Sequence, residues 1–229
     1  MILFYSTSIE NDSVILKEEE HIHCSKVLRK QINDEINVTD GKGNLYICKI
    51  SKINKSNTIC QIMSVERTEK QEPSVAIGIS PTKNPSRLEW FIEKAVEIGI
   101  SEIIIFKAQR TEKKSLNESR LMKILISAMK QSLNLHLPEL RILNNFQEIS
   151  KYCNHFDHKY IAYCDGPTDL LSEIYTKNGS GLVLIGPEGD FTKDEINYAK
   201  NLNFHPASLG KNRLRTETAG LVALMMLKY

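Results

Sequence analysis

The chain has 229 residues, of which 25% are charged and 41% are hydrophobic, and its formal net charge at pH 7 is +2. A chain of this length can bury a substantial core, which excludes a disordered protein and a small disulfide scaffold and suggests one large or two modest domains. The near-neutral charge argues against a partner bound only through positive charge. The longest apolar run, residues 221–227, is far shorter than the ~20 residues of a membrane span, and the N-terminus does not resemble a secretory signal. We therefore expect a cytoplasmic protein that does not enter a membrane.

The cysteines predict neither disulfides nor a metal centre. There are five of them, with no CxxC motif and no two closer than eleven residues, so we expect reduced and mostly buried thiols. Cys153, His155 and His158 are close in the sequence but lack standard spacing and a fourth ligand, so a polar loop is the better interpretation. We expect no metal.

The first third of the chain reads as β-rich, up to the boundary at Glu72-Pro73. Three candidate strands are separated by segments dense in Asp, Gly, Asn and Ser, which short antiparallel connections require. The strands are expected at residues 35–39, 45–53 and 58–65. A short helix within residues 18–30 precedes them, so a small barrel or sandwich follows.

From residue 74 onward, strands and helices alternate, which is typical of an α/β domain with a parallel sheet. The strands are expected at residues 74–79, 102–106, 159–164 and 181–185, and the helices at 87–98 and 118–135. A last helix, residues 216–227, is apolar nearly all round, so we expect burial on more than one side. A subunit interface could supply the second side.

Two loops near the C-terminus carry the chemistry. In residues 182–195 a buried strand runs into Gly-Pro-Glu-Gly and then into a helix whose start Thr192 and Glu195 mark as a capping box. Residues 209–219 repeat this arrangement of a short strand, a loop and a helix. A single such turn is as well explained by glycines that permit positive φ, but two of them favour a ligand site at the strand ends.

The charges of these loops restrict the ligand. Glu188, Asp190 and Glu217 are poor neighbours for a polyphosphate, and neither GxGxxG nor GxxxxGK[ST] occurs. A neutral or cationic nucleoside fits better, and S-adenosylmethionine is the obvious member of that class.

The two loops also carry a family resemblance. GPEGDF (186–191) and LGKNRLRTETA (209–219) closely resemble the SPOUT methyltransferases, specifically the 16S ribosomal RNA uridine methyltransferases that modify ring nitrogen 3 of uridine 1498. The resemblance covers the whole chain. It includes HIHCSKVLR (21–29), DGKGNLY (40–46), Lys83, Glu93-Lys94, Glu97-Ile98-Gly99 and Gln131-Ser132.

The resemblance implies a fold and a cofactor site. Residues 1–72 would form a PUA-like β-barrel that binds RNA, and residues 73–229 a SPOUT domain of α/β class with a deep trefoil knot, dimerising across that domain. Residues from both loops would line the S-adenosylmethionine pocket: Ile185, Gly186, Pro187, Glu188, Gly189, Leu209, Gly210, Leu214, Arg215 and Thr218. Asp190 replaces a glycine found in many relatives and still tolerates turn geometry. Ser132-Leu133-Asn134 lacks the arginine that relatives often have there, which puts that RNA contact in doubt.

Methylation of a uracil ring nitrogen requires alignment with the sulfonium methyl and loss of the N–H proton. Arg215 is the first candidate for a catalytic role, by stabilising a developing uracil oxyanion, although a surface or phosphate-binding arginine is an equal alternative. Glu188 and Glu217 are candidate bases or hydrogen-bond orienters, and the sequence does not distinguish them.

The expected partner is 16S ribosomal RNA in the small ribosomal subunit, either naked or assembled. Basic residues that could contact it are Arg29, Lys83, Arg110, Lys113, Lys114, Lys211 and Arg213, although a charge run alone is usually a solvated face. Two alternatives remain: a non-catalytic RNA-binding or ribosome-assembly protein, and a related enzyme that methylates the ribose 2′-hydroxyl.

Overall fold

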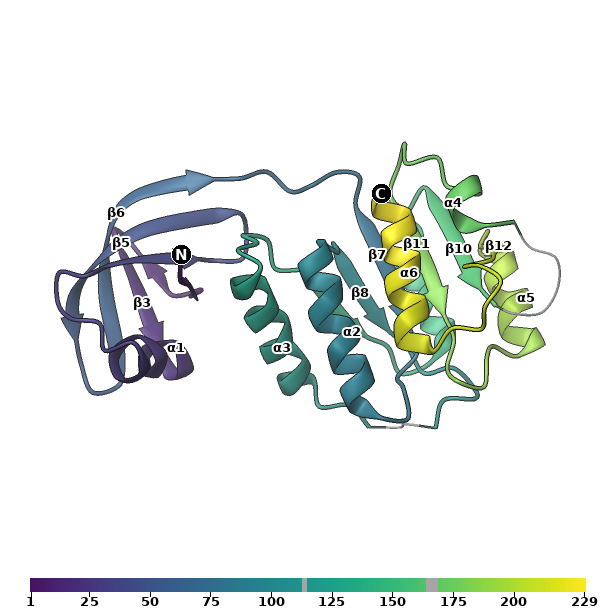
Figure 1. Cartoon of the computed structure of the whole chain (residues 1–229), viewed down its shortest axis with the longest axis horizontal. Helices are drawn as coiled ribbons and strands as arrows, with labels where there is room; N and C mark the ends of the chain where they lie inside the picture. Colours follow the sequence, from purple (N-terminus) through teal and green to yellow (C-terminus); the bar gives the residue numbers. More distant parts are fainter. Residues whose placement is uncertain (113–114, 164–168) are drawn as a thin grey trace. The chain divides into compact units, whose positions relative to one another are not determined.

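The computed structural model describes residues 1–112, 115–163 and 169–229. These residues form two compact units, both drawn in Figure 1. The barrel unit comprises residues 1–70 and 126–137, and the sheet unit comprises residues 71–125 and 138–229. The first break lies close to the boundary expected after residue 72. The return of residues 126–137 to the barrel unit was not expected.

The barrel unit is a six-stranded sheet in the order β1-β4-β5-β6-β3-β2. Its strands are β1 (Leu3–Tyr5), β2 (Ile9–Glu10), β3 (Ser13–Lys17), β4 (Glu35–Thr39), β5 (Asn44–Ile53) and β6 (Asn57–Arg67). Only β1 and β4 pair in parallel. Ser6 links the two ends of the sheet, because its backbone N–H donates to Thr39 O at 3.0 Å and its hydroxyl donates to Ile15 O at 2.6 Å. The three strands expected from the sequence are present.

The barrel unit has its own apolar core. Inward residues of the strands and of the helix that follows β3 form it: Phe4, Val14, Leu16, Cys24, Ile36, Val38, Cys48, Ile50 and Cys60. The expected helix is α1 (Glu18–Ile22), which continues as a π-helical turn, η1 (His23–Val27). His21 is buried and its Nδ1 lies 2.8 Å from Thr58 Oγ1, so it is a structural group. Burial raises the pKa of Cys48 and Cys60 to about 12, which leaves both as inert thiols.

The returning segment completes the barrel unit. It contains the last residues of α3 (Glu118–Gln131) and the chain that follows. Gly43 N donates to Leu135 O at 2.9 Å and Leu137 N donates to Gly41 O at 2.8 Å, so residues 135–137 pair with the turn between β4 and β5. Gly41 and Gly43 adopt positive φ values of 74° and 92°, which glycine accommodates without strain.

The sheet unit is built on six parallel strands in the order β12-β10-β11-β7-β8-β9. The strands are β7 (Val75–Ile79), β8 (Glu102–Ile105), β9 (Glu139–Ile142), β10 (His158–Ala162), β11 (Gly181–Ile185) and β12 (His205–Ala207). The central strands β11, β7 and β8 are fully buried, as expected for a parallel sheet covered on both faces. The four predicted strands are confirmed, and β9 and β12 at the two edges were not predicted.

Helices cover both faces of this sheet. They are α2 (Pro85–Ile98), α4 (Leu171–Ile174), α5 (Lys193–Asn201), α6 (Thr216–Lys228) and the 3-10 turn η2 (Phe146–Lys151). In Figure 1 the yellow α6 lies beside α2 and over β7 and β11, and all of these contact it. Leu182 and Leu184 of β11 pack on the other face against residues of η2 and α5.

The last helix is buried on one side only within this chain. Gly220, Ala223, Leu224 and Leu227 are buried, whereas Met225 on the outer side is 44% exposed. The expectation of burial on more than one side is therefore not met by the chain itself. Among the described residues, no helix has both the length and the hydrophobicity needed to cross a membrane.

Candidate functional site

The loop after β11 is fixed by its own turn and by a capped helix. Asp190 N donates to Pro187 O at 2.9 Å, and Asp190 adopts a left-handed φ of 60°. A Cβ on Gly186 would lie 3.1 Å from the Phe191 ring, so the close approach favours glycine. Thr192 and Glu195 form the predicted capping box at the start of α5. The Gly-Pro-Glu-Gly turn is therefore rigidly positioned at the carboxyl end of a buried strand.

Loops that follow the neighbouring strands hold this turn from the other side. Arg110 Nη1, beyond β8, donates to Gly189 O at 2.8 Å. Lys83 N, beyond β7, donates to Glu188 Oε1 at 3.0 Å. Since the carboxyl ends of parallel strands meet at one edge, the three loops form one continuous rim there.

The second predicted loop joins the first through a buried hydrogen bond. Thr216, in the first turn of α6, donates from its hydroxyl to Gly186 O at 3.1 Å. Arg215 is the N-cap residue of α6 and is exposed. Gly210 has a φ of 126°, in the region that only glycine visits readily. The structure thus brings together the two segments that contain all ten predicted cofactor residues, whose binding roles remain predictions.

The two candidate acids occupy different surroundings. Glu188 is exposed on the rim. Glu217 is 7% exposed, and its Oε1 lies 3.6 Å from Nε of Arg87 on α2. Neither Arg87 nor Thr216 was among the predicted site residues. Thr216 lies inside the LRTETA segment that carries the family resemblance, but no sequence signal connects Arg87 with a carboxylate so distant along the chain.

The predicted RNA-contact residues are distributed over both units. In the sheet unit Lys83, Lys211 and Arg213 are exposed on loops at the carboxyl edge. Arg110 lies at the same edge, but its guanidinium bonds the Gly189 carbonyl, so it has a structural task whatever its role in RNA binding. Arg29 is exposed in the barrel unit. Lys113 and Lys114 lie outside the described residues.

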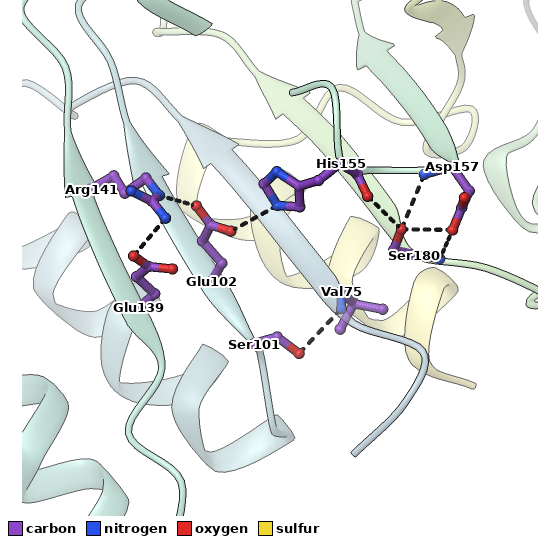
Figure 2. Close-up of polar contacts among 8 residues, drawn as sticks. All are labelled: Val75, Ser101, Glu102, Glu139, Arg141, His155, Asp157 and Ser180. Carbon is purple, nitrogen blue, oxygen red and sulfur yellow. Dashed lines mark hydrogen bonds and ion pairs between the residues drawn. The ribbon is translucent and has the colours of Figure 1, made fainter. Parts of the chain in front are cut away.

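The opposite edge of the sheet carries a separate polar cluster, shown in Figure 2. Glu102, the first residue of β8, is buried and accepts from Arg141 Nε at 2.6 Å, and His155 Nε2 lies 3.5 Å from its other oxygen. Asp157 and Ser180 bond each other beside it. These residues connect the amino ends of the strands, away from the edge where parallel sheets bind ligands.

Cys153, His155 and His158 do not converge. The Cys153 thiol lies 4.0 Å from Ser150 O, His155 faces Glu102, and His158 Nε2 lies 2.9 Å from Asn178 Oδ1. In the part of the chain that the structure describes, no three His, Cys, Asp or Glu residues are grouped to hold a metal ion.

The carboxyl-edge rim is chemically suited to a nucleoside with a positive charge. Backbone groups of the loops and the Glu188 carboxylate lie there beside exposed Lys83, Lys211 and Arg213, and the rim has no phosphate-binding glycine motif. The carboxylate would stabilise a sulfonium placed beside it.

Comparison with known proteins gives consistent matches over the whole chain. The model of an RNA methyltransferase domain matches residues 69–228, and that of an RNA methyltransferase PUA domain matches residues 16–63. The "Ribosomal RNA small subunit methyltransferase E" of Bacillus subtilis is 28% identical over 94% of this chain and 89% of its own. A probable rRNA-methyltransferase from Porphyromonas gingivalis is 36% identical with a TM-score of 0.91, covering 100% of this chain and 98% of its own. Ribosomal RNA small subunit methyltransferase E from Neisseria gonorrhoeae, solved bound to S-adenosyl methionine, is 26% identical with a TM-score of 0.85 and covers 98% and 95%.

Proposed function

Because the chain belongs to the family of RNA methyltransferases that includes the bacterial ribosomal RNA small subunit methyltransferases E, we propose that it methylates ring nitrogen 3 of uridine 1498 in 16S ribosomal RNA. The chain is an S-adenosylmethionine-dependent ribosomal RNA methyltransferase. To this activity the proposal adds the identity of the methylated nucleotide, uridine 1498, and of the atom that receives the methyl group, ring nitrogen 3. A substrate of this kind also favours a cytoplasmic location.

The observation that carries the proposal is the hydrogen bond from Thr216 to Gly186. It joins the two loops of the resemblance at the carboxyl edge of the parallel sheet, where such sheets bind their ligands. S-adenosylmethionine, when bound, supplies an electrophilic methyl group. The residues of this chain supply position and charge.

We assign the proton transfer to Glu188. Uracil must lose its N3 proton for the nitrogen to attack, so a carboxylate within reach of solvent and substrate is needed. Glu188 is exposed, and the hydrogen bond that its Oε1 accepts from Lys83 N fixes the direction of the carboxylate. Glu217 is buried against Arg87, which suits an orienting role at the start of α6 better than proton transfer. Arg215, exposed between the loop and α6, would stabilise the negative charge that develops on a uracil oxygen.

The two units divide the work in this proposal. The barrel unit contacts ribosomal RNA through exposed basic residues such as Arg29, and the sheet unit carries the reaction. The sheet unit would contain the trefoil knot of its family and form a homodimer. The apolar outer side of α6, where Met225 is exposed and Leu221, Val222 and Met226 are half-buried, supports the dimer, since a second copy could cover it.

The test is a methylation assay with the full chain, labelled S-adenosylmethionine, and small subunits that lack the modification. Digestion and mass spectrometry should find one methyl group on the base of uridine 1498. Arg215→Ala should lower kcat by at least about 10²-fold, as removal of an oxyanion donor does. Lys151→Ala, which changes an exposed lysine of η2, is the control and should leave kcat unchanged.

Three results would contradict the proposal. A methyl group on the ribose would make the protein a 2′-O-methyltransferase. No binding of S-adenosylmethionine in calorimetry would indicate a non-catalytic RNA-binding protein. Full activity of Arg215→Ala would remove the proposed role of that residue. Running the assay on naked 16S RNA and on assembled subunits identifies the true substrate.

A further inference from the structure

A cavity of about 260 Å³ lies in the sheet unit beside the loop that follows β7. Its apolar lining comes from Pro85 and Leu88 of α2, from Leu116 just before α3, and from Leu121 of α3. Thr82 lies at its margin, directly before Lys83, whose N–H bonds Glu188. The cavity therefore borders the proposed reaction site, although none of the predicted cofactor residues lines it.

A fixed guanidinium forms part of the cavity lining. Arg120 Nε donates to Glu89 Oε1 at 2.5 Å and Nη2 donates to Oε2 at 2.7 Å, a two-point contact that fixes the plane of the group. The hydrogen bonds from Arg120 also hold the pKa of Glu89 below its ordinary value, so the acid stays charged at neutral pH. The Arg120 side chain is nevertheless 63% exposed, which leaves its surface accessible.

The charge and shape of this lining favour a base over a phosphate. Glu89 neutralises Arg120, so the cavity has little net attraction for an anion, but a flat guanidinium still stacks with a planar ring. Asn117 also lines the cavity, and its side-chain amide nitrogen has no hydrogen-bond partner among the described residues. An amide at the margin of apolar walls can bond the edge of an unpaired base. The volume suits one base, being smaller than typical cofactor pockets.

We propose that this cavity binds an unpaired base of the ribosomal RNA. This base would be stacked on Arg120 and would come from a nucleotide near the methylated uridine in the RNA sequence. The inference rests on the proposed RNA substrate and extends it, because it assigns a second nucleotide site. That base is not the methylated one, which must reach the cofactor loops. Lys83, next to the cavity, is exposed and its Nζ lies 2.9 Å from Glu112 Oε2, so it would exchange this exposed carboxylate for the adjoining phosphate.

The test compares Arg120→Lys and Asn117→Ala with the wild type in binding to small subunits. Arg120→Lys keeps the positive charge beside Glu89 but removes the plane that stacks. Each variant should raise the Kd for subunits about 5- to 10-fold, within the range seen when one stacked base is lost, and leave the Kd for S-adenosylmethionine unchanged. Arg141→Lys makes the same change in the carboxylate-paired arginine of Figure 2 and should leave the Kd for subunits unchanged.

A second measurement locates the nucleotide directly. Ultraviolet crosslinking of the wild-type chain to small subunits, followed by mass spectrometry, should attach a nucleotide other than uridine 1498 to the peptide that contains residues 115–121. Subunit Kd values for both variants equal to the wild type, or a crosslink of uridine 1498 itself to this peptide, would overturn the inference. These readouts do not need methyl transfer. If the chain bound subunits without methylating them, the proposed function would be refuted, but the binding and crosslinking results would still show whether the cavity binds a base.

Discussion

Arg87 and Glu217 form an ion pair at the start of α6, beside the second predicted cofactor loop. A buried carboxylate is costly without a cation beside it, and Arg87 is the cation that the structure provides. The pair joins the start of α2 to the start of α6, the helix whose N-cap residue is Arg215.

The first prediction is a double-mutant cycle on this pair. Arg87→Ala should lower the free energy of unfolding by about 1–3 kcal/mol, less than the loss of a fully buried partner because Arg87 is one-third exposed. Adding Glu217→Gln should recover much of that loss, since the unpaired charge is gone. Denaturant unfolding of the wild type, the two single variants and the double variant measures the coupling energy between the two residues. Additive effects of the two changes on the free energy of unfolding would contradict the pairing.

The barrel unit also contains a buried carboxylate, Asp40. It accepts hydrogen bonds from Lys42 N at 2.8 Å, Asn44 Nδ2 at 2.6 Å and Tyr46 OH at 3.2 Å. Burial by itself raises the pKa of Asp40, but these hydrogen bonds outweigh it and hold the pKa below the ordinary 3.8. Asp40 therefore fixes the turn that receives residues 135–137.

The second prediction concerns the pH dependence of that turn. Because the folded pKa is depressed, ionised Asp40 stabilises the fold fully above its ordinary pKa, and this stabilisation is lost as the pH falls through the folded value. Asp40→Asn should cost about 1–2 kcal/mol at pH 7 and progressively less below about pH 4. Unfolding of both proteins across this range tests it, and a difference that does not change with pH would refute it.

At the scale of elements, the packing of α6 on α2 depends on a missing side chain. A Cβ on Gly220 would lie 2.6 Å from Cε2 of Phe91, which is fully buried and has little room to move. Glycine inside a helix is otherwise unfavourable by about 1 kcal/mol relative to alanine, so its presence here reflects close contact between the helices.

The third prediction is that Gly220→Ala lowers stability by about 1–2 kcal/mol, because overpacking exceeds the gain in helix propensity. The same change in a Phe91→Leu background should cost less, since the ring that it meets is gone. Melting temperatures and denaturant curves of the four proteins provide the readout. An equal cost in both backgrounds would show that the contact is unimportant.

The elements that the sequence predicted well are those with a strong local pattern. The strands β7, β8 and β11 are buried, mostly apolar runs between turns, α2 and α3 have helical periodicity, and α6 is apolar nearly all round. The strand β10 is only partly buried and begins with His158 and Lys159, but its remaining residues are apolar. The edge strands were missed for physical reasons. β12 is three residues long and contains Pro206, which only an edge strand tolerates, and β9 is short and carries charged residues.

The parts of the site that the sequence predicted are those that consist of local motifs. Both loops and the capping box were found, because turn and cap chemistry is local. The contact between Arg87 and Glu217 and the pairing of residues 135–137 with the β4–β5 turn were not, because they join segments that only the folded chain brings together.

At the scale of the whole molecule, the partly exposed apolar side of α6 predicts assembly. Leu221, Val222, Met225 and Met226 recur at helical spacing on the side away from the core, and Met225 is 44% exposed. An apolar stripe of this kind is stable in water when a second copy covers it.

The fourth prediction is that the chain is a dimer that Met225→Lys weakens at least about 10-fold, because the charge would be buried in the interface. Met63→Lys is the matched control, since Met63 on β6 is an exposed methionine of the barrel unit. Sedimentation equilibrium over a range of concentrations should show a raised dissociation constant for the first variant only. A monomeric wild type would refute the proposed dimer.

The chain passes between the barrel unit and the sheet unit three times, after residues 70, 125 and 137. A gene fragment that ends at residue 70 would encode a barrel whose β4–β5 turn lacks its partner, residues 135–137. The barrel unit therefore cannot be exchanged between genes by recombination at one point. A transferred barrel unit must include both residues 1–70 and residues 126–137, so the two gene segments that encode them would have to be inherited together.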